Sequence, residues 1–253
     1  MGGNTFKVKS IFIISFVIVF SFHFRANSEI NPQDIIEKSI EAQGGREVLE
    51  SVKDVVATVS VKIYIPQGEY LGERKVYTKT EPTKIRIEQT IMGTETTIGF
   101  DGENAWLEQM GKAMVAPQSI TDSIKASVIR EDLLLKYKEK GCKIEYLGQT
   151  EVNSQSCYQI KFTDKEGNET TYYFDKKTYL PMKTEFDAPD ETGKIGKNEV
   201  LSSDFRNIKN LVMPFKSIAY FDGKKLLEIT IKEVEINQGL EDSLFSIPIK
   251  KQP

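Results

Sequence analysis

The sequence contains few side chains that could carry out covalent or metal chemistry. Its single histidine, His23, lies in an N-terminal segment that has the features of a secretion leader. A mature chain without histidine cannot use Ser-His-Asp or Cys-His catalysis or bind zinc through histidine. The two cysteines, Cys142 and Cys157, are too few for a structural zinc site. We therefore predict no cofactor and no metal site.

Asp101 and Glu103 form the remaining candidate pair for general acid-base catalysis. Both belong to an Asp-Gly-Glu sequence between two apolar runs, and Asp-Gly in that position is typical of a tight hairpin turn. Because the turn accounts for both residues, the sequence favours a protein that is not an enzyme. Trp106, the only tryptophan, follows this turn. It could pack in a core or contact a ligand.

The first 28 residues have the pattern of a signal peptide. Lys7 and Lys9 precede an apolar run at residues 11–24, and Ala26 and Ser28 stand at positions −3 and −1 of a cleavage site. The apolar run is shorter than the roughly 20 residues of a membrane-spanning helix. We predict cleavage after Ser28 and a periplasmic mature protein, with an uncleaved membrane anchor as the alternative.

The predicted mature chain, residues 29–253, carries 31 basic and 37 acidic residues. This negative balance argues against nucleic acid or an anionic membrane surface as the main partner. The chain is long enough for one domain with a substantial core, and it shows no repeat or low-complexity linker. We predict a single domain and a monomer.

The pattern of apolar residues predicts a mainly β protein. Asn31-Pro32 indicates a helix start and Gly44-Gly45 its end, with a second short helix at residues 46–52. From Val55 the apolar residues alternate, and about eleven strands follow at spacings typical of a sandwich or open barrel. A helical pattern at residues 117–137 interrupts them.

The spacing of the two cysteines bears on a disulfide. A hairpin turn at Asn153-Ser154 would place Cys142 and Cys157 about 25 Å apart along the paired strands. That separation is beyond the reach of a disulfide. A turn near Gln149-Thr150 would pair them instead, but we predict two free thiols.

Several spaced motifs in this sequence belong together. They are Glu41-Ala42-x-Gly44-Gly45, Phe100-Asp101-Gly102 followed by Trp106, Tyr173-Phe174-Asp175-x-x-Thr178-x-Leu180 and Leu244-Phe245-x-x-Pro248, with Leu49-x-x-Val52 before a long strand and Lys84 after Glu81-Pro82. This set resembles the periplasmic lipoprotein carriers and acceptors of the LolA/LolB type, and more closely the outer-membrane lipoprotein-sorting proteins. The resemblance covers nearly all of residues 31–250.

The resemblance implies a strongly curved, unclosed antiparallel sheet with helices across its concave side, and an apolar cavity for acyl chains between them. Carriers of this type have an arginine immediately before the proline of the third strand and use it to transfer cargo. This sequence has Glu81 at that position, so it lacks the arginine that the resemblance implies for cargo transfer.

Two classes of function fit these observations. The first is a non-catalytic carrier or binder of lipidated protein or another acyl ligand, with a possible partner protein in the inner or outer membrane. The second is an envelope sensor or protein-interaction module on the same fold. In the carrier interpretation the inward apolar residues line the cavity: Val61, Ile63, Ile85, Ile87, Ile98, Phe100, Trp106, Tyr158, Ile160, Phe162, Ile229 and Ile231 from strands, and Ile124, Val128 and Leu134 from the helical lid. Each of them could instead simply pack the core.

Overall fold

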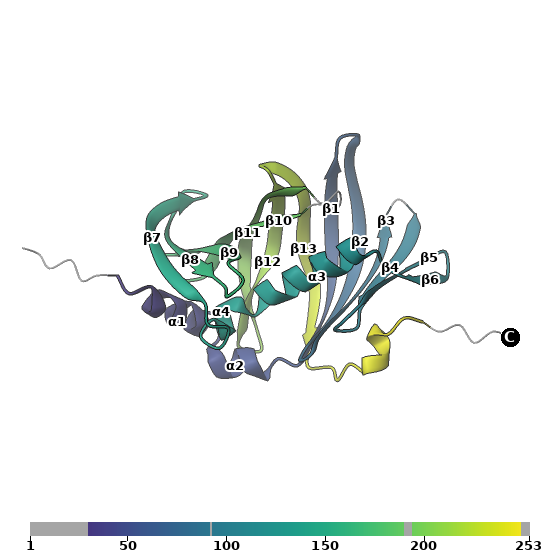
Figure 1. Cartoon of the computed structure of the whole chain (residues 1–253), viewed down its shortest axis with the longest axis horizontal. Coiled ribbons are helices and arrows are strands. Elements are labelled where there is room, and N and C mark those ends of the chain that lie inside the picture. The colour runs from purple at the N-terminus through teal and green to yellow at the C-terminus, as the bar shows by residue number, and fades with distance from the viewer. Residues whose placement is uncertain (1–29, 92, 190–193, 249–253) are drawn as a thin grey trace, which may run out of the picture. The chain divides into compact units, whose positions relative to one another are not determined.

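A computed structural model describes residues 30–91, 93–189 and 194–248 (Figure 1). The predicted leader, residues 1–28, lies outside the described residues. Over the described part, the chain forms one mainly antiparallel β structure with four α-helices and a short 3-10 helix. None of the described helices is long and apolar enough to cross a membrane.

The helices are α1 (Pro32–Ala42), α2 (Arg46–Ser51), α3 (Gln118–Glu131), α4 (Leu133–Lys136) and the 3-10 helix η1 (Asp242–Phe245). The strands are β1 (Asp54–Ile65), β2 (Gly68–Thr80), β3 (Thr83–Ile91), β4 (Thr94–Phe100), β5 (Ala105–Gln109), β6 (Lys112–Val115), β7 (Lys143–Val152), β8 (Gln155–Thr163), β9 (Glu169–Asp175), β10 (Pro181–Pro189), β11 (Ile195–Ile208), β12 (Leu211–Phe221) and β13 (Lys224–Ile236).

All thirteen strands belong to one sheet in the order β6-β5-β4-β3-β2-β1-β13-β12-β11-β10-β9-β8-β7. Consecutive strands pair within each half of the meander, β1 to β6 and β7 to β13, and β13 pairs with β1 to join the two halves. Among the described residues β6 and β7 have no strand partner on their outer sides, so the sheet is not closed. The sequence prediction of an unclosed antiparallel sheet is confirmed.

The predicted count of about eleven strands is wrong, because the sheet has thirteen. Strand β6 was missed. It has only four residues, and its apolar side chains Met114 and Val115 are exposed. Such a strand carries no alternation signal of its own. Its pairing with β5 across the turn at Met110-Gly111 holds it in the sheet instead.

Local signals specify α1 as the sequence predicts. The side chain of Asn31 caps the helix by accepting from the backbone N–H of Gln33 at 3.1 Å, and Pro32 occupies the first turn. Gly44 and Gly45 end the helix with positive φ angles. A Cβ on Gly44 would lie 2.2 Å from the backbone oxygen of Asn210, so only glycine fits beside the β11–β12 turn.

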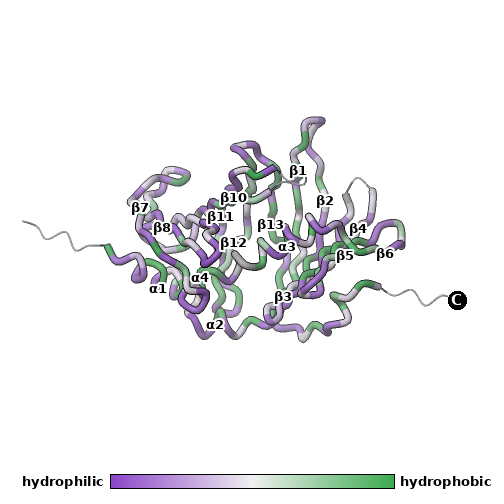
Figure 2. The backbone as a smooth tube through the Cα atoms, viewed as in Figure 1, coloured by the Kyte–Doolittle hydropathy of each residue, from purple (hydrophilic) through white to green (hydrophobic). Residues whose placement is uncertain are grey.

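Strand alternation gives the sheet two distinct faces. We define the inner face as the one that bears Val61, Ile87 and Phe100, and the outer face as the one that bears Arg86 and Trp106. Inner side chains of neighbouring strands lie opposite one another, as in the row Ala57–Val76–Ile87–Ile98–Leu107 across β1 to β5. Figure 2 shows that hydrophobic and hydrophilic residues alternate at short intervals along the strands.

Helices pack on the inner face in two places. Near one edge, α1 and α4 form a closed core with β8 and β9 that includes the fully buried Ile36, Phe162 and Phe174. On the other half of the sheet, Ile120 and Ile124 of α3 join a cluster around Phe100. Helix α3 contacts both β5 and β10, and Figure 1 shows it lying across the strands.

The β7–β8 hairpin turns at Asn153-Ser154, as predicted, because Val152 pairs with Gln155 and Thr150 pairs with Cys157. Cys142 precedes β7 and contacts the α1 core, whereas Cys157 lies in a separate cluster with Val152 and Tyr173. Both cysteines are free, in agreement with the predicted register.

Candidate functional site

A cavity of about 780 Å³ lies between the helices and the inner face. Its apolar lining comes from both layers and comprises Ile40, Leu49, Val52, Val55, Val128, Leu134, Leu135, Tyr172, Pro181 and Leu211. Its polar lining includes Glu50, Lys53, Glu81, Asp132, Lys136 and Glu139. An apolar recess with polar groups beside it is the usual form of a site for an amphiphilic small molecule.

Small side chains and fixed helix positions keep this space open. On the inner face, Thr78 and Thr80 of β2 lie in the cavity wall, where larger apolar residues would fill it. The backbone N–H of Val212 donates to the carbonyl of Gln43 at 2.9 Å, and this bond ties the end of α1 to the β11–β12 turn. The cavity is therefore enclosed by segments from distant parts of the chain.

An ion pair links two sides of the cavity. Lys136 of α4 donates to the carboxylate of Glu81 at 2.7 Å and lies 3.6 Å from that of Asp132. The hydrogen bond from Lys136 lowers the pKa of Glu81 below its usual value. Glu81 thus holds α4 against the β2–β3 turn.

Only two of the predicted lining residues, Val128 and Leu134, lie in the wall of this cavity. The others, apart from Trp106, fall into groups at the inner face. Ile85 and Phe100 pack against Ile124 of α3. Val61, Ile229 and Ile231 form a central apolar patch, and Ile63, Ile87 and Ile98 continue the inner rows of β1, β3 and β4.

The inner apolar surface outside the α1 core is incompletely covered. Ile63, Ile87 and Ile98 are only half-buried, and so are Ile229 and Ile231. Burying such side chains fully would stabilise each by about 1.5–3 kcal/mol relative to exposure. A continuous apolar surface left partly open to water commonly marks a binding surface.

Three predicted lining residues belong to the filled end of the fold. Ile160 and Phe162 are almost completely buried against α1 and α4. Tyr158 packs beside them, with its ring stacked on that of Tyr179 at 6.1 Å. They act as core residues because α1, which alternation along the strands could not place, covers this part of the sheet.

The prediction that Trp106 lines the same apolar surface is wrong. Four residues separate Phe100 from Ala105, so Trp106 pairs with Gly99 and projects from the outer face. Its Nε1–H donates to the carbonyl of Phe245 at 2.7 Å, and its ring lies so close over Gly99 that a Cβ there would be 2.0 Å from Cε2. Trp106 anchors the C-terminal segment.

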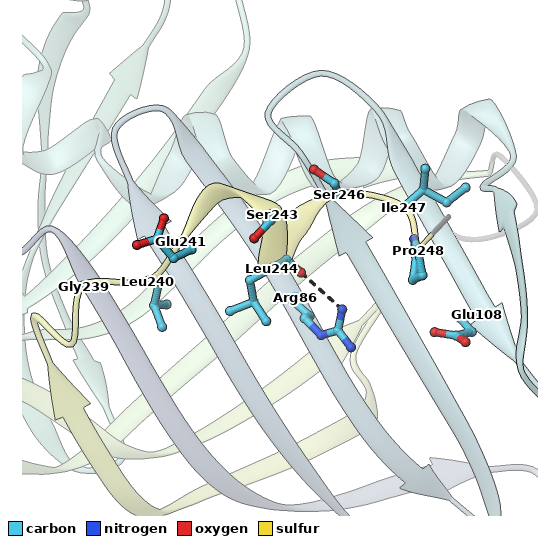
Figure 3. A pocket seen from close by; sticks show the side chains of 10 residues that line it. All are labelled: Arg86, Glu108, Gly239, Leu240, Glu241, Ser243, Leu244, Ser246, Ile247 and Pro248. Carbon is cyan, nitrogen blue, oxygen red and sulfur yellow. Dashed lines mark hydrogen bonds between the residues drawn. The ribbon is translucent and has the colours of Figure 1, made fainter. Parts of the chain in front are cut away.

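The C-terminal segment forms a second recess, shown in Figure 3. Arg86 reaches from β3 under this segment and donates to the carbonyl of Leu244 at 3.2 Å. Lys79 and Lys84 pair with Asp242 in η1. These contacts hold the terminal segment on the outer face, and we assign them a structural role.

Asp101 and Glu103 lie in the turn between β4 and β5. The side chain of Asp101 accepts from the backbone N–H groups of Glu103 and Asn104 at 2.9 and 2.8 Å, so it stabilises the predicted turn. Glu103 is exposed. In the described part of the chain, no group of three or more potential metal ligands comes together.

Several residues that line the cavity were not among the predicted lining residues. Leu49 and Val52 lie just before β1, and their place in the motif Leu49-x-x-Val52 was the available signal. Leu211 is the first residue of β12, and Tyr172 lies in β9. Nothing in the local sequence indicates that these two line the same cavity as Leu49, because α2, β9 and β12 lie far apart in the chain.

An unclosed antiparallel sheet that carries helices over an apolar cavity defines the class of fold to which this chain belongs. The sequence itself matches no protein-family model and no curated protein. Solved structures do share the fold. A Vibrio parahaemolyticus domain assigned to the outer membrane lipoprotein-sorting proteins is 17% identical, with a TM-score of 0.54 over 83% of this chain and 97% of that one.

Two further structures are similar to this chain. The LolA superfamily protein NE2245 from Nitrosomonas europaea is 14% identical, with a TM-score of 0.55, and 86% of this chain and 98% of that one are covered. A DUF1329 family protein from Desulfovibrio piger is also 14% identical, with a TM-score of 0.56 and the same coverage. The chain therefore has the LolA-like fold, as the sequence resemblance predicted.

Proposed function

We propose that this protein is a non-catalytic binder or carrier of acyl chains in outer-membrane lipoprotein sorting. Its ligand is a lipidated protein or another acyl compound. The observation that carries the proposal is the cavity of about 780 Å³ beside a partly open apolar surface. Its volume lies within the roughly 300–1,000 Å³ of small-molecule sites. Each enclosed CH₂ group would contribute about 0.8 kcal/mol, so a long chain can bind without a charged contact.

We further propose that the sheet is strongly curved, with the helices over its concave side. The contacts of α3 support this shape. It touches both β5 and β10, which are eight strand spacings apart in the sheet order. In a flat sheet that separation would be about 38 Å. A 14-residue helix is only about 21 Å long.

The proposed location is the periplasm, reached through the leader that ends at Ser28. A membrane partner protein would deliver or receive the ligand. The likeness to a lipoprotein-sorting domain supports this setting. N-terminal sequencing of the exported protein should begin at Glu29, and finding residues 1–28 retained in a membrane fraction would contradict the proposed leader.

Native mass spectrometry of protein purified from its own envelope tests the function directly. We expect a retained mass in the range of a lipid, which should be lost after extraction with detergent. A fluorescent fatty-acid probe should then bind the extracted protein with a stoichiometry of about one. If neither lipid nor probe binds, the cavity is not an acyl site, and an interaction module on the same fold becomes the better explanation.

A further inference from the structure

Arg74 is an unusual residue on the inner face. It lies on β2 between Gly72 and Val76, and Val76 packs in the central apolar cluster. Across the strands it pairs with Val59 on one side and Gln89 on the other. The alternation of β2 therefore directs a permanently charged guanidinium toward the apolar side of the sheet.

No described residue forms a hydrogen bond or ion pair with this guanidinium. Its Nε is buried without a partner, and so is Oε1 of the neighbouring Gln89. Burial lowers the pKa of Arg74, with no opposing contribution from a nearby acid. An unpaired polar group in such a place costs free energy, and a charged one costs more. The described part of the protein alone thus leaves Nε of Arg74 and Oε1 of Gln89 without hydrogen-bond partners.

The acidic residues around Arg74 cannot neutralise it. Glu73 and Glu88 occupy alternate positions of β2 and β3 and so project from the outer face, where they pair with Lys232 and Arg86. An anion that satisfies Arg74 must therefore come from outside this part of the sheet. The planar guanidinium fork matches the oxygens of a carboxylate or a phosphate.

Arg74 also lies where a head group would be expected. It begins a polar row, Arg74–Gln89–Thr96–Gln109, that crosses four adjacent strands beside the apolar row of Val76 and Ile98. Thr78, in the wall of the cavity, is four residues further along β2. This corresponds to about 14 Å of strand. An acyl chain in the cavity could therefore extend along the apolar row and end at Arg74.

We propose that Arg74 and Gln89 bind the oxyanion head group, a carboxylate or a phosphate, of an acyl ligand whose chain runs along the inner face into the cavity. The proposal rests on the acyl-binding function proposed above and narrows the ligand to anionic amphiphiles. The Gln89 amide can offer a donor or an acceptor beside the anion, according to the orientation of its terminal group.

Competition against a neutral fluorescent acyl probe tests the proposal with three matched ligands at pH 8: dodecanoate, dodecyl phosphate and dodecanol. The wild-type protein should bind at least one of the two anions at least tenfold more tightly than dodecanol. The anion with the larger gain in affinity over dodecanol identifies the head-group class.

Arg74→Gln should remove this preference for anions while leaving the affinity for dodecanol within twofold. Arg74→Lys should retain part of it. Lys75→Gln, which removes an adjacent positive charge on the outer face, is the matched control and should leave the affinities for all three ligands unchanged.

The possible failures are distinguishable. Equal binding of all three ligands by the wild-type protein would overturn the role of Arg74 and leave acyl binding intact. This comparison needs no variant, so it holds even if Arg74→Gln fails to fold. A preference for anions that survives Arg74→Gln would also overturn the assignment, because another cation would then be responsible. Binding of neither the probe nor any of the three ligands would overturn both the proposed function and this head-group site.

Discussion

Nζ of Lys136 in α4 lies 2.7 Å from Oε1 of Glu81 in the turn between β2 and β3. This ion pair joins the helical layer to the sheet beside the cavity. An arginine at position 81 would repel Lys136 instead of pairing with it. Glu81 therefore holds α4 to the β2–β3 turn.

We expect Glu81→Arg to loosen α4 and speed the exchange of a bound acyl probe. Amide hydrogen exchange at residues 133–137 should accelerate as well. Thermal stability should change little, because exposed ion pairs contribute weakly. Glu69→Arg, which breaks a comparable exposed pair with Lys62 away from the cavity, is the matched control. Unchanged probe exchange in Glu81→Arg would show that α4 does not gate the site.

Trp106→Phe should destabilise the protein without affecting acyl binding. The substitution leaves the carbonyl of Phe245 without its donor in a buried site, which costs about 1–3 kcal/mol. Urea denaturation measures the loss. Probe affinity should stay within twofold because Trp106 projects from the outer face. Weaker probe binding at unchanged stability would instead indicate that Trp106 contacts the acyl ligand.

Ile124→Asp tests whether α3 covers a ligand site or a filled core. Ile124 lies on α3 and is half-buried against the Phe100 cluster, so a carboxylate there can turn toward water at modest cost. We expect probe binding to be lost while most of the thermal stability remains. Ile36→Asp is the matched control in the filled α1 core, where an unpartnered carboxylate should cost several kcal/mol. Equal destabilisation by the two substitutions would argue for a filled core under α3.

The two thiols should differ in reactivity. Cys157 is fully buried, and burial raises its pKa to about 11, so it should not react with a thiol reagent at pH 8 in the native protein. Cys142 is partly exposed and should react slowly, because burial also raises its pKa. Denaturation without reductant should release two thiols. Cys142→Ser should abolish the native signal, and Cys157→Ser should leave it intact.

Glu185 should contribute to acid unfolding. Partial burial acts to raise its pKa, but hydrogen bonds from Lys183, Tyr173 and Lys197 outweigh burial and lower it to about 2. Between pH 4.5 and 2 the unfolded chain therefore binds more protons at this position than the folded chain. Stability from Glu185 is present above pH 4.5 and is lost as the pH falls toward 2.

We accordingly expect Glu185→Gln to reduce the dependence of unfolding free energy on pH between 4.5 and 2. Urea titrations at several pH values measure this slope. Glu151→Gln, at an exposed position of β7, is the control and should preserve the wild-type slope. An unchanged slope in Glu185→Gln would mean that the charged cluster on the outer face does not stabilise the folded state.

Local patterns in the sequence determined much of the fold. Asn31 and Pro32 begin α1, the glycine pair ends it, and Asn153-Ser154 turns the β7–β8 hairpin, because capping and turn formation depend on a few adjacent residues. Alternation likewise identified most strands. It missed β6, where four largely exposed residues carry no such pattern.

Only the tertiary structure decided which apolar residues fill a core and which surround a cavity. Ile160 and Ile87 have the same alternation in sequence, yet α1 buries the first and leaves the second half-exposed. The face of Trp106 depended on the length of one turn, and the isolation of Arg74 depended on the absence of an acid from the inner face of β1 and β3. These outcomes depend on the packing and pairing of separate elements, and alternation along a single strand carries no information about what packs on either face.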